Sequence, residues 1–160
     1  MSPAERDDDA AARAADSPLV HDFGLLLKAA TRLEQRIDAA LREECQVGHT
    51  MFEVLIRLCR HPDEEISQRR LAEDLTLTSG GVTRLIDRME TAGLVRRVPA
   101  PGDRRSVLVE ATEHGRAVFL RAAVVHARVV ERYFVAPVPR ADYGRLTRSL
   151  GEIEAALRDG

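Results

Sequence analysis

Apolar residues recur at three- and four-residue steps along most of this chain, the spacing that places side chains on one face of an α-helix. The first stretch is the longest and runs from residue 19 to residue 45, with charged residues on its opposite face. Shorter stretches with the same spacing follow at residues 51–58, 68–75, 79–91, 113–135 and 142–158. The pattern therefore predicts a mainly α-helical protein.

The period of the pattern changes after Gly93. Residues 94–98 and 106–109 have the composition of two short strands, and residues 99–103 between them are rich in Pro and Gly. This order predicts a β-hairpin. The two short helices that precede the hairpin are joined by a turn of only a few residues, as in a helix-turn-helix. The predicted fold is therefore mainly α with a small β-wing, a winged helix-turn-helix.

Local signals predict where several helices begin and end. Thr50 and Glu53 have the spacing of a capping box, which predicts that Thr50 begins the second helix. Ser67 and Thr112 occupy the N-cap positions of the third helix and of the long helix after the hairpin. Gly93 stands where the C-terminal cap of the fourth helix is expected.

The chain divides by composition into a tail and two structural parts. Residues 1–17 are rich in Ala and Asp without periodicity, which predicts a disordered acidic tail. Residues 50–112 hold the winged helix-turn-helix. The apolar stripes of residues 19–46 and 113–158 are too extensive for one small winged domain, which favours a helical dimerisation region. A closed monomeric bundle is the alternative.

Charge is distributed unevenly along the chain. The net charge is −2, yet residues 79–107 carry six arginines against three carboxylates, a local charge of +3. Residues 1–20 sum to −3. Local charge is what meets a phosphate backbone, so the distribution favours binding to DNA despite the acidic total.

The fourth helix has the size of a recognition helix that fits the major groove of DNA. Thr and Ser can bond bases or phosphates, Arg can bond guanine through two hydrogens, and the glycines would let backbone N–H groups approach a phosphate. A loose helix start with solvated arginines is the alternative. The predicted DNA contacts are Thr78, Ser79, Gly80, Gly81, Thr83, Arg84 and Arg88 on the helix and Arg104 and Arg105 on the wing.

The segment from Leu71 to Thr112 resembles the MarR (multiple antibiotic resistance regulator) family of winged helix-turn-helix transcriptional regulators. The ordered runs VTRLIDRME, GLVRR and DRR carry the resemblance, and Thr112 and Gly115 match the residues that begin the following helix in the family. Ala111 departs from the pattern, since a Leu usually stands there. The resemblance extends weakly over residues 19–158.

The resemblance implies roles for the wing and for the assembly. Asp103 would structure the wing through an ion pair, and Arg105 would enter the minor groove, where negative potential is concentrated. The protein would be a homodimer that reads palindromic double-stranded DNA, with half-sites about 10 bp apart. It would be a repressor relieved by a small aromatic or anionic effector, although the pattern itself assigns no effector residues.

Other chemistry is not indicated by the sequence. Cys45 and Cys59 extend apolar faces, so we expect buried thiols rather than oxidant sensors. The five histidines lack the spacing of paired ligands, and we find no catalytic motif, so neither a metal or other cofactor nor an enzyme is predicted. No stretch suits a membrane span or a secretory signal, which suggests the cytoplasm. The competing hypothesis is an effector-binding or protein-interaction module without DNA activity.

Overall fold

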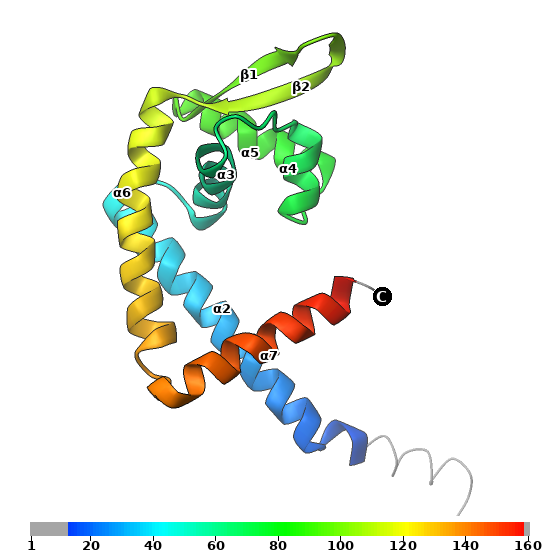
Figure 1. Ribbon diagram of the computed structural model, residues 1–160, viewed down its shortest axis with the longest axis vertical. Helices are drawn as coiled ribbons and strands as arrows, with labels where there is room; N and C mark the ends of the chain where they lie inside the picture. Colours follow the sequence, from blue (N-terminus) through cyan, green and yellow to red (C-terminus); the bar gives the residue numbers. More distant parts are fainter. Residues whose placement is uncertain (1–12, 159–160) are drawn as a thin grey trace, which may run out of the picture. The chain divides into compact units, whose positions relative to one another are not determined.

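The computed structural model describes residues 13–158 and, for residues 103–106, the backbone alone. The chain divides into two compact units, and the boundary lies between Arg36 and Ile37, inside the first long helix. The elements from Ile37 onward form the larger unit, which contains the predicted winged helix-turn-helix (Figure 1).

The fold is mainly helical with a two-stranded wing, as predicted. Among the described helices, none combines the length and the apolar character that a membrane span needs. The helices are α2 (Pro18–Cys45), α3 (His49–Arg60), α4 (Gln68–Asp74), α5 (Ser79–Thr91), α6 (Glu113–Val130), a π-helical turn η1 (Glu131–Val135) and α7 (Arg140–Arg158). The antiparallel strands are β1 (Val95–Ala100) and β2 (Asp103–Ala111).

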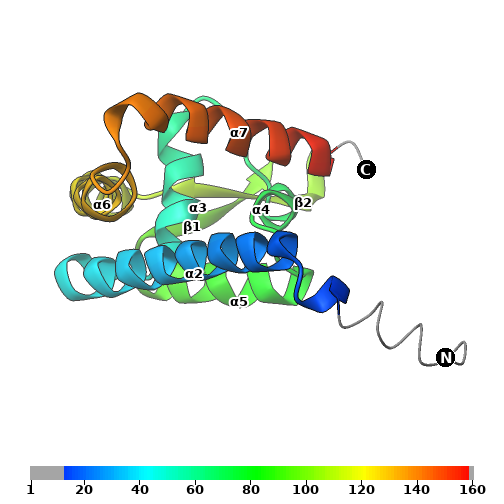
Figure 2. The same cartoon turned by 90° about the horizontal axis from the view of Figure 1, so that it is seen from below.

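The core of the larger unit is apolar and lies around α3. This helix packs against α6 and β2, while α5 packs against α4 and β1 (Figure 1). Figure 2 looks along α6 and shows that α3 runs crosswise to it. The largest fully buried side chains are Leu41, Phe52, Val54, Leu55, Leu71, Val82, Ile86 and Met89.

Two of the predicted N-caps are confirmed, and one is wrong. The hydroxyl oxygens of Ser67 and Thr112 accept hydrogen bonds from backbone N–H groups at the starts of α4 and α6. Thr50, by contrast, lies inside α3, which begins at His49. The Asp38 carboxylate of α2 accepts the His49 N–H at 2.8 Å, so a side chain from another helix caps α3.

The Asp38 cap is strengthened by charge. The Arg42 guanidinium bonds Asp38 at 2.6 Å, and this bond, followed by the bond from the His49 N–H, holds the pKa of the carboxyl below its usual value. A charged carboxylate at a helix N-terminus is also favoured by the helix dipole. The capping-box prediction failed because the cap comes from outside the local sequence.

Two further segments differ from prediction. Residues 13–15, assigned to the disordered tail, form a helical turn, and residues 1–12 of that tail lie outside the described part of the chain. The loop of the wing is shorter than predicted, because β1 and β2 extend to a turn at Pro101 and Gly102. Gly102 has a φ of +78°, which favours Gly.

The helix after the wing also changes geometry near its end. The α-helical pattern stops at Val130, and η1 continues as a wider π-helical turn. The three- and four-residue spacing of this helix would place Tyr133 on the buried stripe with Val125 and Val129, but the residue is 42% exposed. The wider turn rotates residues after Val130 away from the α-helical stripe, which accounts for the difference.

The junction between α5, the wing and α6 requires Gly115. A methyl group built on Gly115 would overlap the backbone carbonyl group of Leu94. Thr112 closes the same junction, because its hydroxyl donates to the Gly93 carbonyl oxygen at 2.6 Å and its N–H donates to the Leu94 carbonyl oxygen at 3.0 Å. Thr112 and Gly115, which carry part of the resemblance, therefore serve to close this junction.

We predict that Gly115→Ala lowers the free energy of unfolding by about 1–3 kcal/mol, because a backbone segment must move to admit the methyl group. Gly144→Ala in α7 is the matched control, since nothing lies within 4 Å of a methyl group there. The control should be neutral or more stable by up to about 1 kcal/mol. Urea unfolding followed by circular dichroism measures both, and equal stabilities would contradict the close approach.

We also predict that stability falls as the pH drops below about 6.5, the ordinary pKa of histidine. His126 of α6 packs on Phe52, with ring centroids 5.1 Å apart. Burial, and to a lesser degree the neighbouring His49, lowers the pKa of His126, while Glu53 opposes the shift. Below pH 6.5 the unfolded chain therefore binds protons more readily than the folded chain does, and stability decreases.

Unfolding at several pH values between 8 and 5.5 tests this linkage. His126→Phe should flatten the pH dependence, whereas His114→Phe, at an exposed position, should leave it unchanged. A wild-type slope retained in His126→Phe would assign the effect to other groups.

Candidate nucleic-acid interface

The predicted recognition helix is α5, and its boundaries agree with the sequence prediction. Thr78 is the N-cap, and its hydroxyl oxygen accepts the Gly81 N–H at 3.0 Å. Ala92 is the C-cap, and Gly93 follows with a φ of +69°, as a C-terminal glycine should. The buried face of the helix consists of Val82, Leu85, Ile86 and Met89.

The opposite side of α5 exposes most of the predicted contact residues. Arg84 and Arg88 are exposed, and the side chain of neither forms a hydrogen bond or ion pair with another described residue. Thr78, Ser79 and Gly80 are exposed at the helix start. Two such cations, one helical turn apart, can approach the phosphates or bases of a DNA groove.

Two predicted contacts are partly used within the protein. Gly81 is half-buried, and its N–H bonds the Thr78 cap, so the predicted approach of this N–H to a phosphate would compete with a bond inside the helix and stays a prediction. Thr83 is also half-buried. Its hydroxyl accepts a bond from Gln68 at 2.8 Å and donates to the Ser79 carbonyl oxygen at 2.9 Å.

The positive charge of Arg97 is used within the protein, where it holds the site together, and is not free to bind DNA. Its side chain is 25% exposed and bonds Asp87 at 2.8 Å and Glu90 at 2.6 Å, both on α5. Its backbone N–H donates to the other oxygen of the Glu90 carboxylate at 2.8 Å. Its Nε donates to the side-chain oxygen of Gln68 at 3.1 Å. One arginine of β1 thereby joins the wing to α4 and α5.

Sequence reasoning missed this role, although a signal was present. Arg96 and Arg97 are adjacent in a strand, where successive side chains point to opposite faces. One of the two therefore had to face the helices. Arg96 is the outward one, and it pairs with Glu110 of β2 at 2.7 Å on an exposed surface.

The backbone of the wing places the remaining predicted residues. Asp103 begins β2 directly after the turn, and Arg104 and Arg105 follow it in the strand. A register shift between Pro99 and Ala100 marks the end of regular pairing. The side chains of residues 103–106 lie outside the described part of the structure, so the ion pair of Asp103 and the contacts of Arg104 and Arg105 stay predictions.

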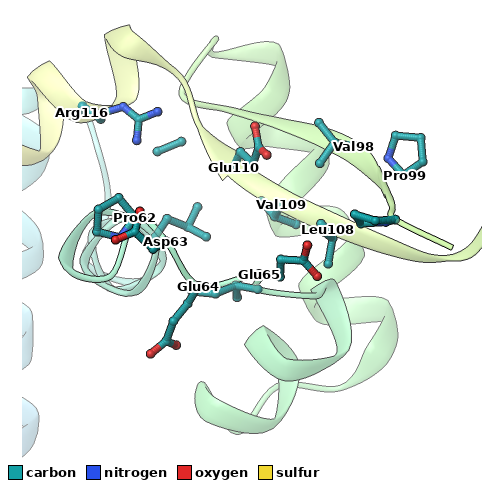
Figure 3. A pocket seen from close by; sticks show the side chains of 14 residues that line it. Pro62, Asp63, Glu64, Glu65, Val98, Pro99, Leu108, Val109, Glu110 and Arg116 are labelled. Atoms are coloured by element: carbon teal, nitrogen blue, oxygen red, sulfur yellow. The ribbon is translucent and has the colours of Figure 1, made fainter. Parts of the chain in front are cut away.

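A hollow with a volume of about 420 Å³ lies behind the wing (Figure 3). The loop from Pro62 to Ile66, the two strands and Arg116 at the start of α6 line it, and α5 does not contribute to the described lining. The charged residues of this lining are the carboxylates Asp63, Glu64, Glu65 and Glu110 and the cation Arg116. This balance disfavours an anionic ligand in the hollow.

The two cysteines differ in their surroundings. Cys45 is buried, as expected, whereas Cys59 is only half-buried. Burial raises the pKa of the Cys59 thiol, although the charge of Arg116 opposes the shift. Because the thiolate is the reactive form, this environment disfavours reactivity at Cys59.

The sequence of this chain is similar to that of known proteins. The sequence model of the MarR family matches residues 49–106. The HTH-type transcriptional regulator PecS of Dickeya dadantii is 30% identical over 137 residues, which are 83% of this chain and 82% of PecS.

Solved structures are similar over most of the chain. AbsC, a MarR family transcriptional regulator from Streptomyces coelicolor, is 25% identical with a TM-score of 0.78, covering 87% of this chain and 93% of AbsC. A second MarR family regulator from S. coelicolor, crystallised in complex with DNA, is 27% identical with a TM-score of 0.79 and 91% coverage of both chains.

We predict that Arg97→Met lowers the free energy of unfolding by about 2 kcal/mol, because it removes the guanidinium that bonds two carboxylates and an amide oxygen. Arg96→Met is the matched control in the same strand and should cost less than about 1 kcal/mol, as exposed ion pairs do. Thermal or urea unfolding measures the difference. Equal losses in the two variants would show that Arg97 is no more structural than its neighbour.

Proposed function

Because this chain belongs to the MarR family of transcriptional regulators, we propose that it binds a palindromic operator as a homodimer and represses transcription. The observation that carries the proposal is the exposed side of α5, where the side chains of Arg84 and Arg88 bond no other described residue. The other side of α5 is packed into the core, so the exposed side is the one that can enter a major groove.

The wing supplies the second contact in this proposal. Arg104 and Arg105 follow the turn in β2. In this proposal their side chains enter a groove adjacent to the one entered by α5. The similar regulator from S. coelicolor was crystallised with DNA, which supports the same mode of binding here. With Arg96 and Arg97 paired to carboxylates, the affinity comes from the helix arginines and the wing tip.

Exposed apolar side chains support the homodimer. In the larger unit, Leu120 and Val124 of α6 are 65% and 69% exposed, and no residue of α7 is buried. The last helix nevertheless carries an apolar stripe that includes Ile153 and Leu157. Such surfaces are costly in water and favour cover by a second chain rather than a closed monomeric bundle.

The first unit points to the same conclusion. Its part of α2 exposes six large apolar side chains, whereas a solvated helix would carry few: Leu19, Val20, Phe23, Leu25, Leu26 and Leu27. In a homodimer with two-fold symmetry, both recognition helices face the same side of DNA, one helical turn apart. The predicted operator therefore has two half-sites about 10 bp apart.

Relief by a small aromatic or anionic effector is part of the proposal. The hollow behind the wing is acidic, so an anionic effector should bind elsewhere in the dimer. The alternative function, an effector-binding or interaction module without DNA activity, does not account for the two arginines on the exposed side of α5.

DNA binding is tested with the full chain and the DNA upstream of its own gene, by fluorescence anisotropy at several salt concentrations. We expect palindrome-dependent binding that weakens steeply with salt, because binding to phosphates releases counterions. Arg84→Ala and Arg88→Ala should each weaken binding, and the salt slope should decrease by about 1 for each phosphate that the removed cation neutralised. Arg105→Ala should cost about 1–3 kcal/mol if it makes a specific groove contact.

Arg148→Ala in the exposed part of α7 is the matched control, and its affinity should equal that of the wild type. Absence of palindrome-dependent binding at low salt would overturn the proposed function. Unchanged binding by the α5 variants, with wild-type binding intact, would overturn only the assignment of these arginines.

A further inference from the structure

Thr83 is a predicted base contact whose hydroxyl is already bonded on two sides. We propose that Thr83 reads DNA only as a hydrogen-bond acceptor, facing an amino group on a base, and that Gln68 and Arg97 are the positioning residues that hold it in this state. The inference rests on the proposed DNA binding and adds a rule for sequence recognition.

The proton of the Thr83 hydroxyl is committed within the helix. The hydroxyl donates to the Ser79 carbonyl oxygen at 2.9 Å and accepts from the Gln68 amide nitrogen at 2.8 Å. A hydroxyl has one proton and two acceptor positions. One acceptor position and the methyl group therefore remain for DNA, and no donor remains.

The direction of the Gln68–Thr83 bond is fixed by a cation. The side-chain oxygen of Gln68 accepts from the Arg97 Nε at 3.1 Å. An arginine in a protein stays protonated and only donates, so the Gln68 oxygen must face Arg97. The amide nitrogen must then face Thr83. Reversal of the amide would place its NH₂ group against the N–H of Arg97.

Arg97 is itself held firmly enough to impose this order. Asp87 and Glu90 bond two of its guanidinium nitrogens at 2.8 and 2.6 Å, and the Thr83 carbonyl oxygen accepts a further bond at 3.3 Å. The network thus returns to the residue that it positions. Gln68, Thr83 and Arg97 are all half-buried, which protects these bonds from exchange with water.

The consequence for recognition follows from the major groove. Adenine N6 and cytosine N4 present donors there, whereas the edges of guanine and the O4 atom of thymine present acceptors. An acceptor-only Thr83 therefore favours adenine or cytosine at the base it faces. Gly80 lies one turn before Thr83 and has no side chain that would cover it from the DNA side.

The test measures base preference in every half-site position with single-base variants of the bound operator. Wild-type protein should prefer adenine or cytosine at one position. Thr83→Val keeps the shape but removes the acceptor, and should reduce this preference about three- to tenfold, the effect of one hydrogen bond. Thr83→Ser should retain it. Thr91→Val is the matched control, because Thr91 also bonds the carbonyl four residues earlier but accepts no bond from a described glutamine.

Gln68→Met tests positioning through a double-mutant cycle. On its own it should weaken the same preference, and in the Thr83→Val background it should have no further effect on that preference. A merely structural role would lower affinity equally for every sequence. Two results would overturn this inference while leaving the proposed function intact. One is wild-type operator binding together with an unchanged base preference in Thr83→Val. The other is a double-mutant cycle in which Gln68→Met and Thr83→Val reduce the base preference additively. No operator binding by the wild type would overturn the proposed function and this inference with it.

Discussion

The close approach of the start of α6 to the end of α5 is the contact on which the arrangement of α5 and the wing depends. Gly115 allows the Leu94 carbonyl group to lie against the helix, and Thr112 bonds the carbonyl oxygens of Gly93 and Leu94. The chain therefore leaves the recognition helix, forms the wing and returns to the same point. Both ends of the wing are thereby fixed to the end of α5.

Arg97 adds a second connection between the wing and the helices. The junction fixes the base of the wing, and Arg97 fixes the side of β1 against α5 and, through Gln68, against α4. The carboxylates of Asp87 and Glu90 would otherwise add negative charge to the surface that we propose faces phosphates. Their pairing with Arg97 offsets that charge while using it to hold the helices, so one set of bonds serves both stability and electrostatics.

Much of the fold could be predicted because its signals are local. The end of α5 follows from Gly93, and the wing follows from its change of period and its Pro- and Gly-rich turn. The cap of α3 could not be predicted, since Asp38 reaches His49 only after α2 and α3 have folded. In the site, the exposure of Arg84 and Arg88 follows from helical spacing. The bond from Gln68 to Thr83 joins residues of two helices, and no pattern along the sequence predicts it.

The π-helical turn at the end of α6 has a consequence for how this protein can change by insertion and deletion. Each residue added to or removed from a helix turns everything that follows by about 100° around the axis. Deleting one residue from Glu131–Val135 could restore a regular α-helix without disturbing the core, yet the following segment would leave α6 in a different direction. The number of residues in this short turn, rather than the composition of α7, would then decide which way the apolar stripe of α7 faces.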